Sequence, residues 1–252
     1  MIIDTPQKAH APALRALWQE AFGDSDAFLD TFAKTAFSPA RCRVLLLDDA
    51  PVAGLYWFDC LCRGQRIAYL YAIATAKAFR GRGLCRALME DTHRHLTAAG
   101  YAGAVLVPGA PTLFQLYEKM GYTVCSCVAE IAPQAAVEPA GLREIDTDTY
   151  AALRRQFLPE GGVLQEAESL AFLQAQASLY AGEHFVLAAR REGASLRGLE
   201  LLGDPGAAPA ILTALGCSKG HFRTSGNGRP FAMYHPLDDA VPPPTYFGLA
   251  FD

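Results

Sequence analysis

The sequence lacks the features of several common protein classes. Its 252 residues contain no hydrophobic run near the roughly 18 residues of a membrane-spanning helix. The N-terminus carries Asp4 and no hydrophobic signal segment, so we expect a cytoplasmic protein without a membrane contact. Lys and Arg (22) do not outnumber Asp and Glu (26), and a net charge of -4 offers no overall basic surface for nucleic acid.

The seven cysteines form no familiar metal or disulfide pattern. An odd number favours reduced thiols. The pairs Cys60/Cys62 and Cys125/Cys127 lack the two-residue spacer of a zinc knuckle, so we interpret them as small apolar strand residues, with a shared zinc site as the alternative. We expect no metal. The sequence also has no G-x-S-x-G, G-x4-G-K-[ST] or H-E-x-x-H motif.

What is present is typical of a soluble globular protein of one large or two modest domains, with 51% hydrophobic and 19% charged residues. In the first half, residues 1–3 predict a short strand and residues 10–22 an amphipathic helix. Ser25 predicts the start of a second helix, to about residue 37. Residues 43–47 and 52–61 predict a hairpin.

The most informative stretch is residues 68–100. Residues 68–75 predict a buried strand, and residues 84–99 predict a helix that Gly100 ends. The turn between them is basic and rich in glycine, and it opens the helix. Free backbone N–H groups and the positive end of the helix dipole make such a turn a binding site for phosphate.

This turn, Arg80-Gly81-Arg82-Gly83-Leu84-Cys85, resembles the acetyl-CoA pyrophosphate loop of the GNAT N-acetyltransferases, Gln/Arg-x-x-Gly-x-Gly/Ala. Cys85 departs from the last position but is small. Residues 116–122, LYEKMGY, resemble the segment that follows the fifth strand of the same family, while Ala110 and Pro111 stand where the family often has an Asn. The order of predicted elements over residues 1–131 is also similar to that family.

The resemblance implies an α/β (α+β) GNAT acyl-CoA N-acyltransferase fold, a mixed central sheet flanked by helices. It also implies acetyl-CoA as co-substrate, with the pantetheine arm along the central strand near a bulge and an oxyanion donor at the N–H of Ile73. By the same resemblance, Tyr117 protonates the departing thiolate. The implied cofactor-binding residues are Ile73, Ala74, Thr75, Arg80, Gly81, Arg82, Gly83, Leu84 and Cys85.

The base that deprotonates the acceptor is less well defined. The central strand offers no carboxylate. Asp59 on the preceding strand and the C-terminal carboxylate of Asp252 are the candidates, and deprotonation through water needs neither. Half of the aromatic set Tyr69, Tyr71, Trp57 and Phe58 is expected to line the acceptor side, because strand residues alternate between faces.

We divide the chain into a GNAT domain (residues 1–132), a linker rich in proline and alanine (133–141) and a smaller α/β domain (142–252). Weak sequence similarity between the two halves suggests that the second domain is a degenerate repeat of the first. Residues 185–199 match the hairpin at residues 44–55, and one strand is missing. Its loop at 203–206 carries Asp204 and would repel a pyrophosphate. Residues 225–228 predict a hairpin turn, and residues 246–251 a final strand.

We therefore expect an N-acetyltransferase that transfers acetyl from acetyl-CoA to a primary amine of a small molecule or peptide, by direct attack in a ternary complex. The alternative is a non-catalytic CoA-binding sensor of the same fold. Nucleic-acid binding has only the arginines at 80, 82 and 86 in its favour. The second domain is expected to wall the acceptor pocket or to form a homodimer face.

Overall fold

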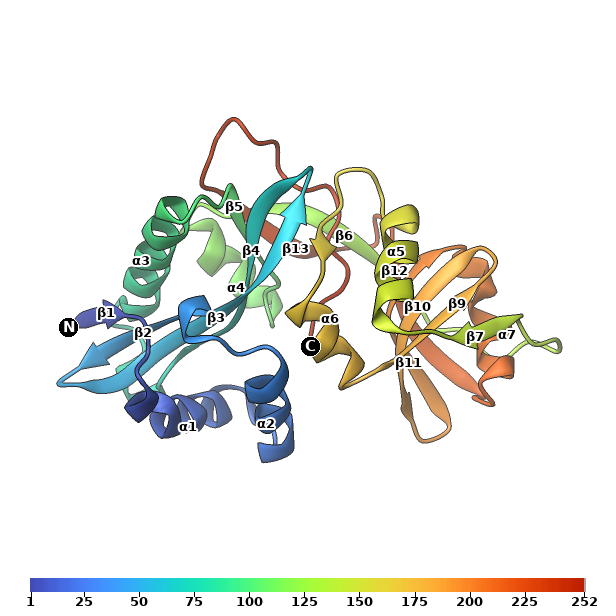
Figure 1. Cartoon of the computed structure of the whole chain (residues 1–252), viewed down its shortest axis with the longest axis horizontal. Helices are drawn as coiled ribbons and strands as arrows, with labels where there is room; N and C mark the ends of the chain where they lie inside the picture. The colour runs from blue at the N-terminus through green and yellow to red at the C-terminus, as the bar shows by residue number, and fades with distance from the viewer. Residues whose placement is uncertain (252) are drawn as a thin grey trace.

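Figure 1 shows the computed structural model, which describes residues 1–251. Within them, thirteen strands form one mixed sheet along the length of the molecule, with helices on its faces. The strand order is β1-β2-β3-β4-β5-β13-β6-β12-β11-β10-β9-β7, and β8 pairs with β3 outside this row. The mixed α/β architecture expected from the sequence is confirmed.

The first half of the chain forms one end of this sheet. Two helices, α1 and α2, cover one face, where Trp18 and Phe32 pack on Tyr56. On the other face α3 buries Leu88 and Met89 against the strands. The elements are β1 (Ile2–Asp4), α1 (Ala11–Phe22), α2 (Asp26–Thr35), β2 (Cys42–Leu47), β3 (Ala50–Cys62), β4 (Gln65–Thr75), α3 (Leu84–Ala98), β5 (Gly103–Leu106), α4 (Pro111–Glu118) and β6 (Thr123–Ile131).

These elements lie close to their predicted positions because their signals are local. The Ser25 side chain accepts a hydrogen bond from the N–H of Phe28 and caps α2 as expected. Gly23, Gly100 and Gly121 follow α1, α3 and α4 with positive φ, which glycine adopts without steric cost.

The second half repeats the same order of elements. Strands β1-β2-β3-β4 are antiparallel neighbours and α3 leads to the parallel strand β5, just as β7-β9-β10-β11 are antiparallel and α7 leads to the parallel strand β12. The elements are β7 (Leu142–Glu144), α5 (Thr147–Phe157), β8 (Leu164–Gln165), α6 (Glu168–Gln174), β9 (Ser178–Gly182), β10 (Phe185–Glu192), β11 (Ser195–Gly203), α7 (Ala208–Ala214), β12 (Lys219–Ser225) and β13 (Arg229–Pro236).

This order corrects the predicted alignment of the repeat by one strand. By their position in the sheet, β10 and β11 correspond to β3 and β4. The predicted alignment had matched them to the preceding hairpin, β2 and β3. The strand thought to be missing is β9, a five-residue strand that pairs with β7 and β10. Its sequence, SLYAG, is too short to show a clear period of two, so the pattern of residues left it unassigned.

The predicted hairpin at residues 225–228 is wrong. Strand β12 pairs with one side of β6, up to the pair Ser225↔Val128, and β13 continues along the other side from Arg229↔Val128. The chain therefore crosses over β6 instead of turning back. A side chain at Gly226 or Gly228 would lie within 2.8 Å of β6 atoms, so glycine is needed for the crossing.

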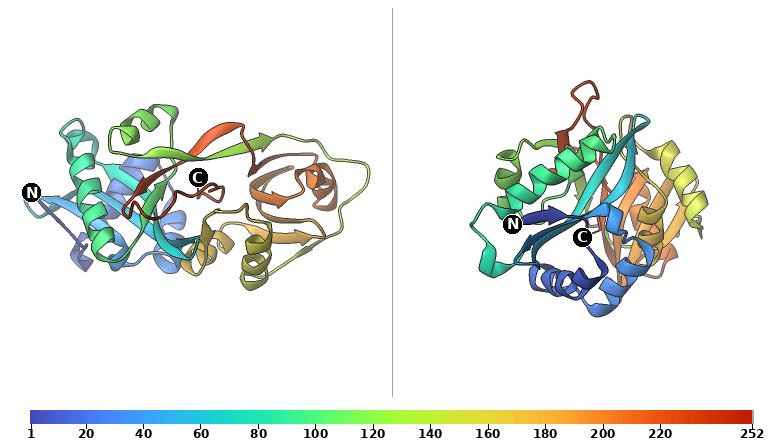
Figure 2. Two further views of the ribbon diagram at one scale, coloured as in Figure 1. Left: turned by 90° about the horizontal axis from the view of Figure 1, so that it is seen from above. Right: turned by 60° about the vertical axis from the view of Figure 1, so that its left-hand side comes forward.

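The crossing places β13 between β5 and β6, strands of the first half. Figure 2 shows the end of the chain returning to lie against that half. The division into residues 1–132 and 142–252 stays a proposal, but any boundary must allow for this returning strand.

Residues 246–251 do not form the predicted final strand. Tyr246 forms an isolated β-bridge with Gly162. In the rest of the segment, main-chain groups bond to side chains instead of to a neighbouring strand. Gln165 Nε2 donates to the carbonyl of Leu249 (2.9 Å), and the Tyr71 hydroxyl donates to that of Phe251 (3.0 Å). The segment is buried although it has no regular structure, because its polar groups are satisfied in this way.

Candidate active site

Strand β4 contains a bulge in its middle. Gly54 of β3 pairs with Ala74, whereas Tyr56 pairs with Tyr71, so β4 has one extra residue over this interval. Ala72 lies in the bulge with φ +49, an unusual conformation for a residue with a side chain. The bulge expected beside Ile73 is therefore present, and it takes this part of β4 out of regular pairing.

Strands β4 and β5 separate just before the bulge. Their parallel pairing runs from Ile67↔Gly103 to Tyr69↔Val105 and ends there. Beyond Tyr69, no strand among residues 1–251 pairs with the β4 edge that faced β5.

A cleft of about 950 Å³ lies at this separation. One wall is formed by β4 and by the segment from β5 into α4, and includes Ile73 and Tyr117. Residues of α1, of α2 and of the turn between them also line the cleft. The end of the chain, Ala250 and Phe251, also lines it. The cleft thus brings together the predicted oxyanion donor and the predicted acid.

The glycine-arginine turn precedes α3 as predicted. Gly81 (φ +75) and Gly83 (φ +77) have positive φ, and a Cβ at either position would meet no atom within 4 Å. No backbone N–H from residue 81 to residue 86 donates a hydrogen bond within residues 1–251. These open donors at a helix N-terminus fit a phosphate-bearing group.

Both arginines of the turn are exposed, and each donates a hydrogen bond from one of its side-chain nitrogens to a main-chain carbonyl. Nε of Arg80 donates to the carbonyl of Thr75 (2.9 Å), and Nη2 of Arg82 donates to the carbonyl of Ala78 (3.1 Å). Each guanidinium keeps further N–H groups for an anion.

Tyr117 is buried at 7% exposure, and its ring packs against Tyr122. Its hydroxyl has no hydrogen-bond partner among residues 1–251 and is available to a ligand in the cleft. Burial raises the pKa of Tyr117 well above its usual value. Burial also raises the pKa of the neighbouring Cys85 thiol, which disfavours a reactive thiolate there.

Asp59 is not among the residues that line the cleft. Its carboxylate accepts a hydrogen bond from Tyr101 and lies 3.6 Å from Arg41 and 3.7 Å from Arg66. The structure therefore does not bring Asp59 together with Tyr117. Asp252 lies outside the described residues.

The aromatic residues of β3 and β4 divide as alternation requires. Tyr69 and Tyr71 line the cleft, and Phe58 packs beside them on the same face. Trp57 points to the opposite face, where its Nε1 donates to the Tyr101 hydroxyl (3.3 Å).

Sequence reasoning missed the wall formed by the first two helices. Trp18, Phe22, Asp24 and Phe28 all line the cleft. Trp18 and Phe22 follow the periodicity of core residues, which gives no sign of a cleft. The one available signal was Asp24, a carboxylate directly after the Gly23 stop. Gln176 and Arg190 of the second half also line the cleft, and no sequence signal marked them.

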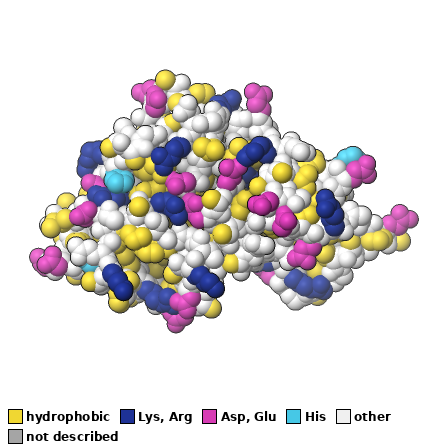
Figure 3. Space-filling view, in the orientation of Figure 1, with side chains coloured by type: hydrophobic (Ala, Val, Ile, Leu, Met, Phe, Trp, Pro, Cys, Tyr) yellow, Lys and Arg dark blue, Asp and Glu magenta, His cyan; other side chains and the backbone are white. Residues whose placement is uncertain are grey.

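Three further observations concern possible membrane spans, metal sites and surface charge within the described residues. None of the helices in residues 1–251 combines the length and hydrophobicity needed to cross a bilayer. No group of three or more His, Cys, Asp or Glu side chains within those residues is placed to hold a metal. On the face shown in Figure 3, basic and acidic side chains are interspersed.

Comparison with known proteins agrees with this geometry. The family described as "Acetyltransferase (GNAT) domain" matches residues 3–125. A search of curated proteins gave no significant match.

Solved structures share the fold over 94% of this chain. A GCN5-related N-acetyltransferase from Kribbella flavida is 16% identical, with a TM-score of 0.73 and 72% of its own chain covered. A second, from Anabaena variabilis, is 15% identical (TM-score 0.69, 73% covered), and Eis1 from Mycobacterium abscessus is 14% identical (TM-score 0.69, 74% covered). This chain is therefore an acyltransferase whose residues 3–125 form a GNAT acetyltransferase domain.

Proposed function

We propose that this acyltransferase transfers an acetyl group from acetyl-CoA to a primary amine, by direct attack of the amine in a ternary complex. One observation carries the proposal: the β4 bulge beside Ile73 and the free hydroxyl of Tyr117 line the same cleft. Cys85, at the start of α3, packs in the same hydrophobic cluster as Tyr117 and so connects the glycine turn to this cleft.

The residues of the turn would hold the co-substrate. The main-chain N–H groups of residues 81–86 and the free N–H groups of Arg80 and Arg82 would bind the diphosphate, with Gly83 leaving room for it. The edge of β4 from Ile73 to Thr75, which pairs with no strand among residues 1–251, would bind the pantetheine arm. Acetyl-CoA supplies the activated thioester.

In the reaction, the N–H of Ile73 would hydrogen-bond to the thioester carbonyl oxygen as negative charge develops on it. The amine nitrogen forms a bond to the acetyl carbon, and the carbon–sulfur bond breaks with its electron pair on sulfur. Cys85 takes no part, since its buried thiol is a poor nucleophile.

Tyr117 would then stabilise the leaving thiolate. The ordinary pKa of tyrosine already lies above that of a thiol, and burial raises the pKa of Tyr117 further, so complete proton transfer to sulfur is uphill. A hydrogen bond from the hydroxyl to the thiolate needs no such transfer and still favours bond breaking. Deprotonation of the acceptor is assigned to Asp252 or to water, since Asp59 is held by Arg41 and Arg66.

The test combines coenzyme binding with turnover. Tyr117→Phe should lower kcat about 10- to 100-fold in a thiol-release assay with an amine panel, the loss expected for a hydrogen bond to a charged group, while the Kd for CoA stays within twofold. Replacing Arg80 and Arg82 with alanine should weaken CoA binding about tenfold or more by calorimetry. Arg94→Ala, which removes an exposed charge of α3 away from the turn, is the control.

Indifference of the wild-type chain to CoA would contradict the proposal. So would full activity of Tyr117→Phe. Asp252→Asn tests the side-chain carboxylate of Asp252: a large fall in kcat that high pH restores points to this group, and an unchanged kcat points to the main-chain carboxylate of that residue or to water.

A further inference from the structure

The charged residues that line the cleft differ in whether they have an ion-pair partner. Among residues 1–251 they are Asp24, Glu118, Arg190 and Arg229. Both arginines already have carboxylate partners: Arg190 Nε lies 3.0 Å from Glu192, and Arg229 is paired with Glu130. Asp24 and Glu118 form no ion pair within residues 1–251. The uncompensated charge in the cleft is therefore negative.

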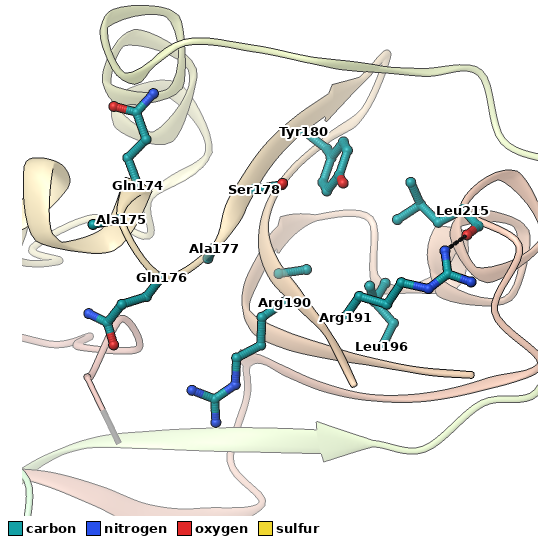
Figure 4. A pocket seen from close by; sticks show the side chains of 11 residues that line it. Gln174, Ala175, Gln176, Ala177, Ser178, Tyr180, Arg190, Arg191, Leu196 and Leu215 are labelled. Carbon is teal, nitrogen blue, oxygen red and sulfur yellow. Dashed lines mark hydrogen bonds between the residues drawn. The ribbon is translucent and has the colours of Figure 1, made fainter. Parts of the chain in front are cut away.

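The nearby pocket in the second half does not change this balance. Figure 4 shows that the Arg190 side chain leaves that pocket in a different direction from Arg191. The Arg191 guanidinium is used at the end of α7, where it donates to the carbonyls of Leu215 (2.8 Å) and Gly216 (3.0 Å). Among residues 1–251, each arginine that lines the cleft or this pocket already has a partner, so none offers an unpaired guanidinium to an anionic acceptor.

Asp24 is held in a defined position. The indole Nε1 of Trp18 donates to its Oδ2 (2.7 Å), while Oδ1 accepts no hydrogen bond within residues 1–251. The carboxylate is partly buried, so solvent screens it less than a fully exposed one. Glu118, in contrast, is exposed on α4. Asp24 is therefore the better placed of the two to bind a cation.

The surroundings of Asp24 also favour a cation. The buried Trp18 lies at ring distances of 6.0 Å from Phe22, 6.4 Å from Phe28 and 5.6 Å from Tyr71, and all four line the cleft. Phe22, at 48% exposure, is the ring of this group that a ligand can reach. The faces of aromatic rings attract ammonium groups, and their hydrocarbon surface binds an apolar chain.

We propose that Asp24 binds a second positive group of the acceptor, and that the acceptor is a diamine or polyamine whose cationic groups are joined by an apolar linker. One amine would react beside Ile73 while the other lies against Asp24 and the exposed Phe22 ring. This inference rests on the proposed acetyl transfer and names its substrate class. It makes Asp24 a specificity-determining residue.

The test compares linear diamines with monoamines of the same chain length in the thiol-release assay. Wild-type protein should show a KM for diamines about fivefold to tenfold below that for monoamines, with similar kcat, as expected for one partly screened ion pair. Asp24→Asn should raise KM for diamines about fivefold to tenfold and so abolish the preference for diamines over monoamines. Asp30→Asn, which removes a nearby α2 charge outside the cleft, should change neither.

Equal KM for both classes in wild-type protein would overturn the inference and leave acetyl transfer intact. Loss of the preference in Glu118→Gln but not in Asp24→Asn would also overturn it. If no amine is acetylated, the proposed function fails instead. Calorimetry with a diamine alone still tests Asp24, because binding should be present in the wild type and weaker in Asp24→Asn.

Discussion

Gly83 has two roles at one position. Its φ of +77 turns the chain into α3, and the space where a Cβ would lie is empty. A side chain there would strain the backbone and occupy the region in which a phosphate would approach the N–H groups. These two effects can be separated, because only the second depends on a ligand.

We predict that Gly83→Ala lowers the free energy of unfolding by about 1 kcal/mol, the cost of a left-handed conformation in a residue with a Cβ. It should weaken CoA binding about tenfold, measured by calorimetry. Gly193→Ala is a matched control, since Gly193 has φ +63 and equally open space in the turn between β10 and β11. It should cost similar stability and leave CoA binding unchanged. Equal loss of binding in both variants would contradict the assignment.

At the scale of elements, α3 is joined to the returning strand β13 by a pair of histidines. The rings of His93 and His235 stack at 4.2 Å, and His93 Nε2 shares a hydrogen bond with the Tyr122 hydroxyl (2.8 Å). Burial, and then the neighbouring His235, lower the pKa of His93 to about 3. The helix that carries the glycine turn is thus fixed by a histidine that stays neutral in the folded protein.

This lowered pKa predicts acid sensitivity. The unfolded chain takes up the His93 proton near pH 6.5 and the folded one near pH 3, so this stabilisation is complete above pH 6.5 and is lost progressively below it. His93→Phe should be less stable than wild type at pH 7.5 and lose less stability between pH 6.5 and 4.5, in urea unfolding. The control is His184→Gln, an exposed histidine before β10, which should keep the wild-type slope. An unchanged slope in His93→Phe would contradict this account.

For the whole molecule, the position of β13 decides which parts can fold alone. It lies between β5 and β6, and residues 246–251 fill the space beside Tyr71. A fragment of residues 1–132 would lose both, leaving two strand edges unpaired and core side chains exposed.

We therefore predict that residues 1–132, expressed alone, show no cooperative urea unfolding and are prone to aggregate. Circular dichroism and size-exclusion chromatography would measure this. Adding residues 133–252 as a separate chain should restore the cooperative transition. A fragment that unfolds cooperatively without them would show that β13 is dispensable for the first half.

Elements and site residues could be predicted from the sequence where the pattern that marks them lies within one short segment. The strand, turn and helix around Gly83 and the position of Tyr117 in α4 could be predicted because turn, cap and periodicity are local. The part of the cleft that α1 and α2 line could not be predicted, because Trp18 has the spacing of a core residue whether it faces a core or a cleft.

Contacts between distant segments of the chain were the other feature that could not be predicted from the sequence. The glycines at 226 and 228 have the composition of a hairpin turn, and only the presence of β6 beneath them makes them a crossing. Asp59 was a plausible base until Arg41 and Arg66, from elsewhere in the chain, were found beside it. In both cases the partner lies in a distant segment that no local pattern identifies.

The crossing at β13 also bears on the making of the protein in the cell. Chains emerge from the ribosome N-terminus first, and β13 is the last strand of the described residues to be synthesised. Until it arrives, the nascent chain carries β5 and β6 without the strand that separates them. Catalytic competence should therefore appear only late in translation, and a ribosome that stalls in the second half would leave a product that depends on chaperones to stay soluble.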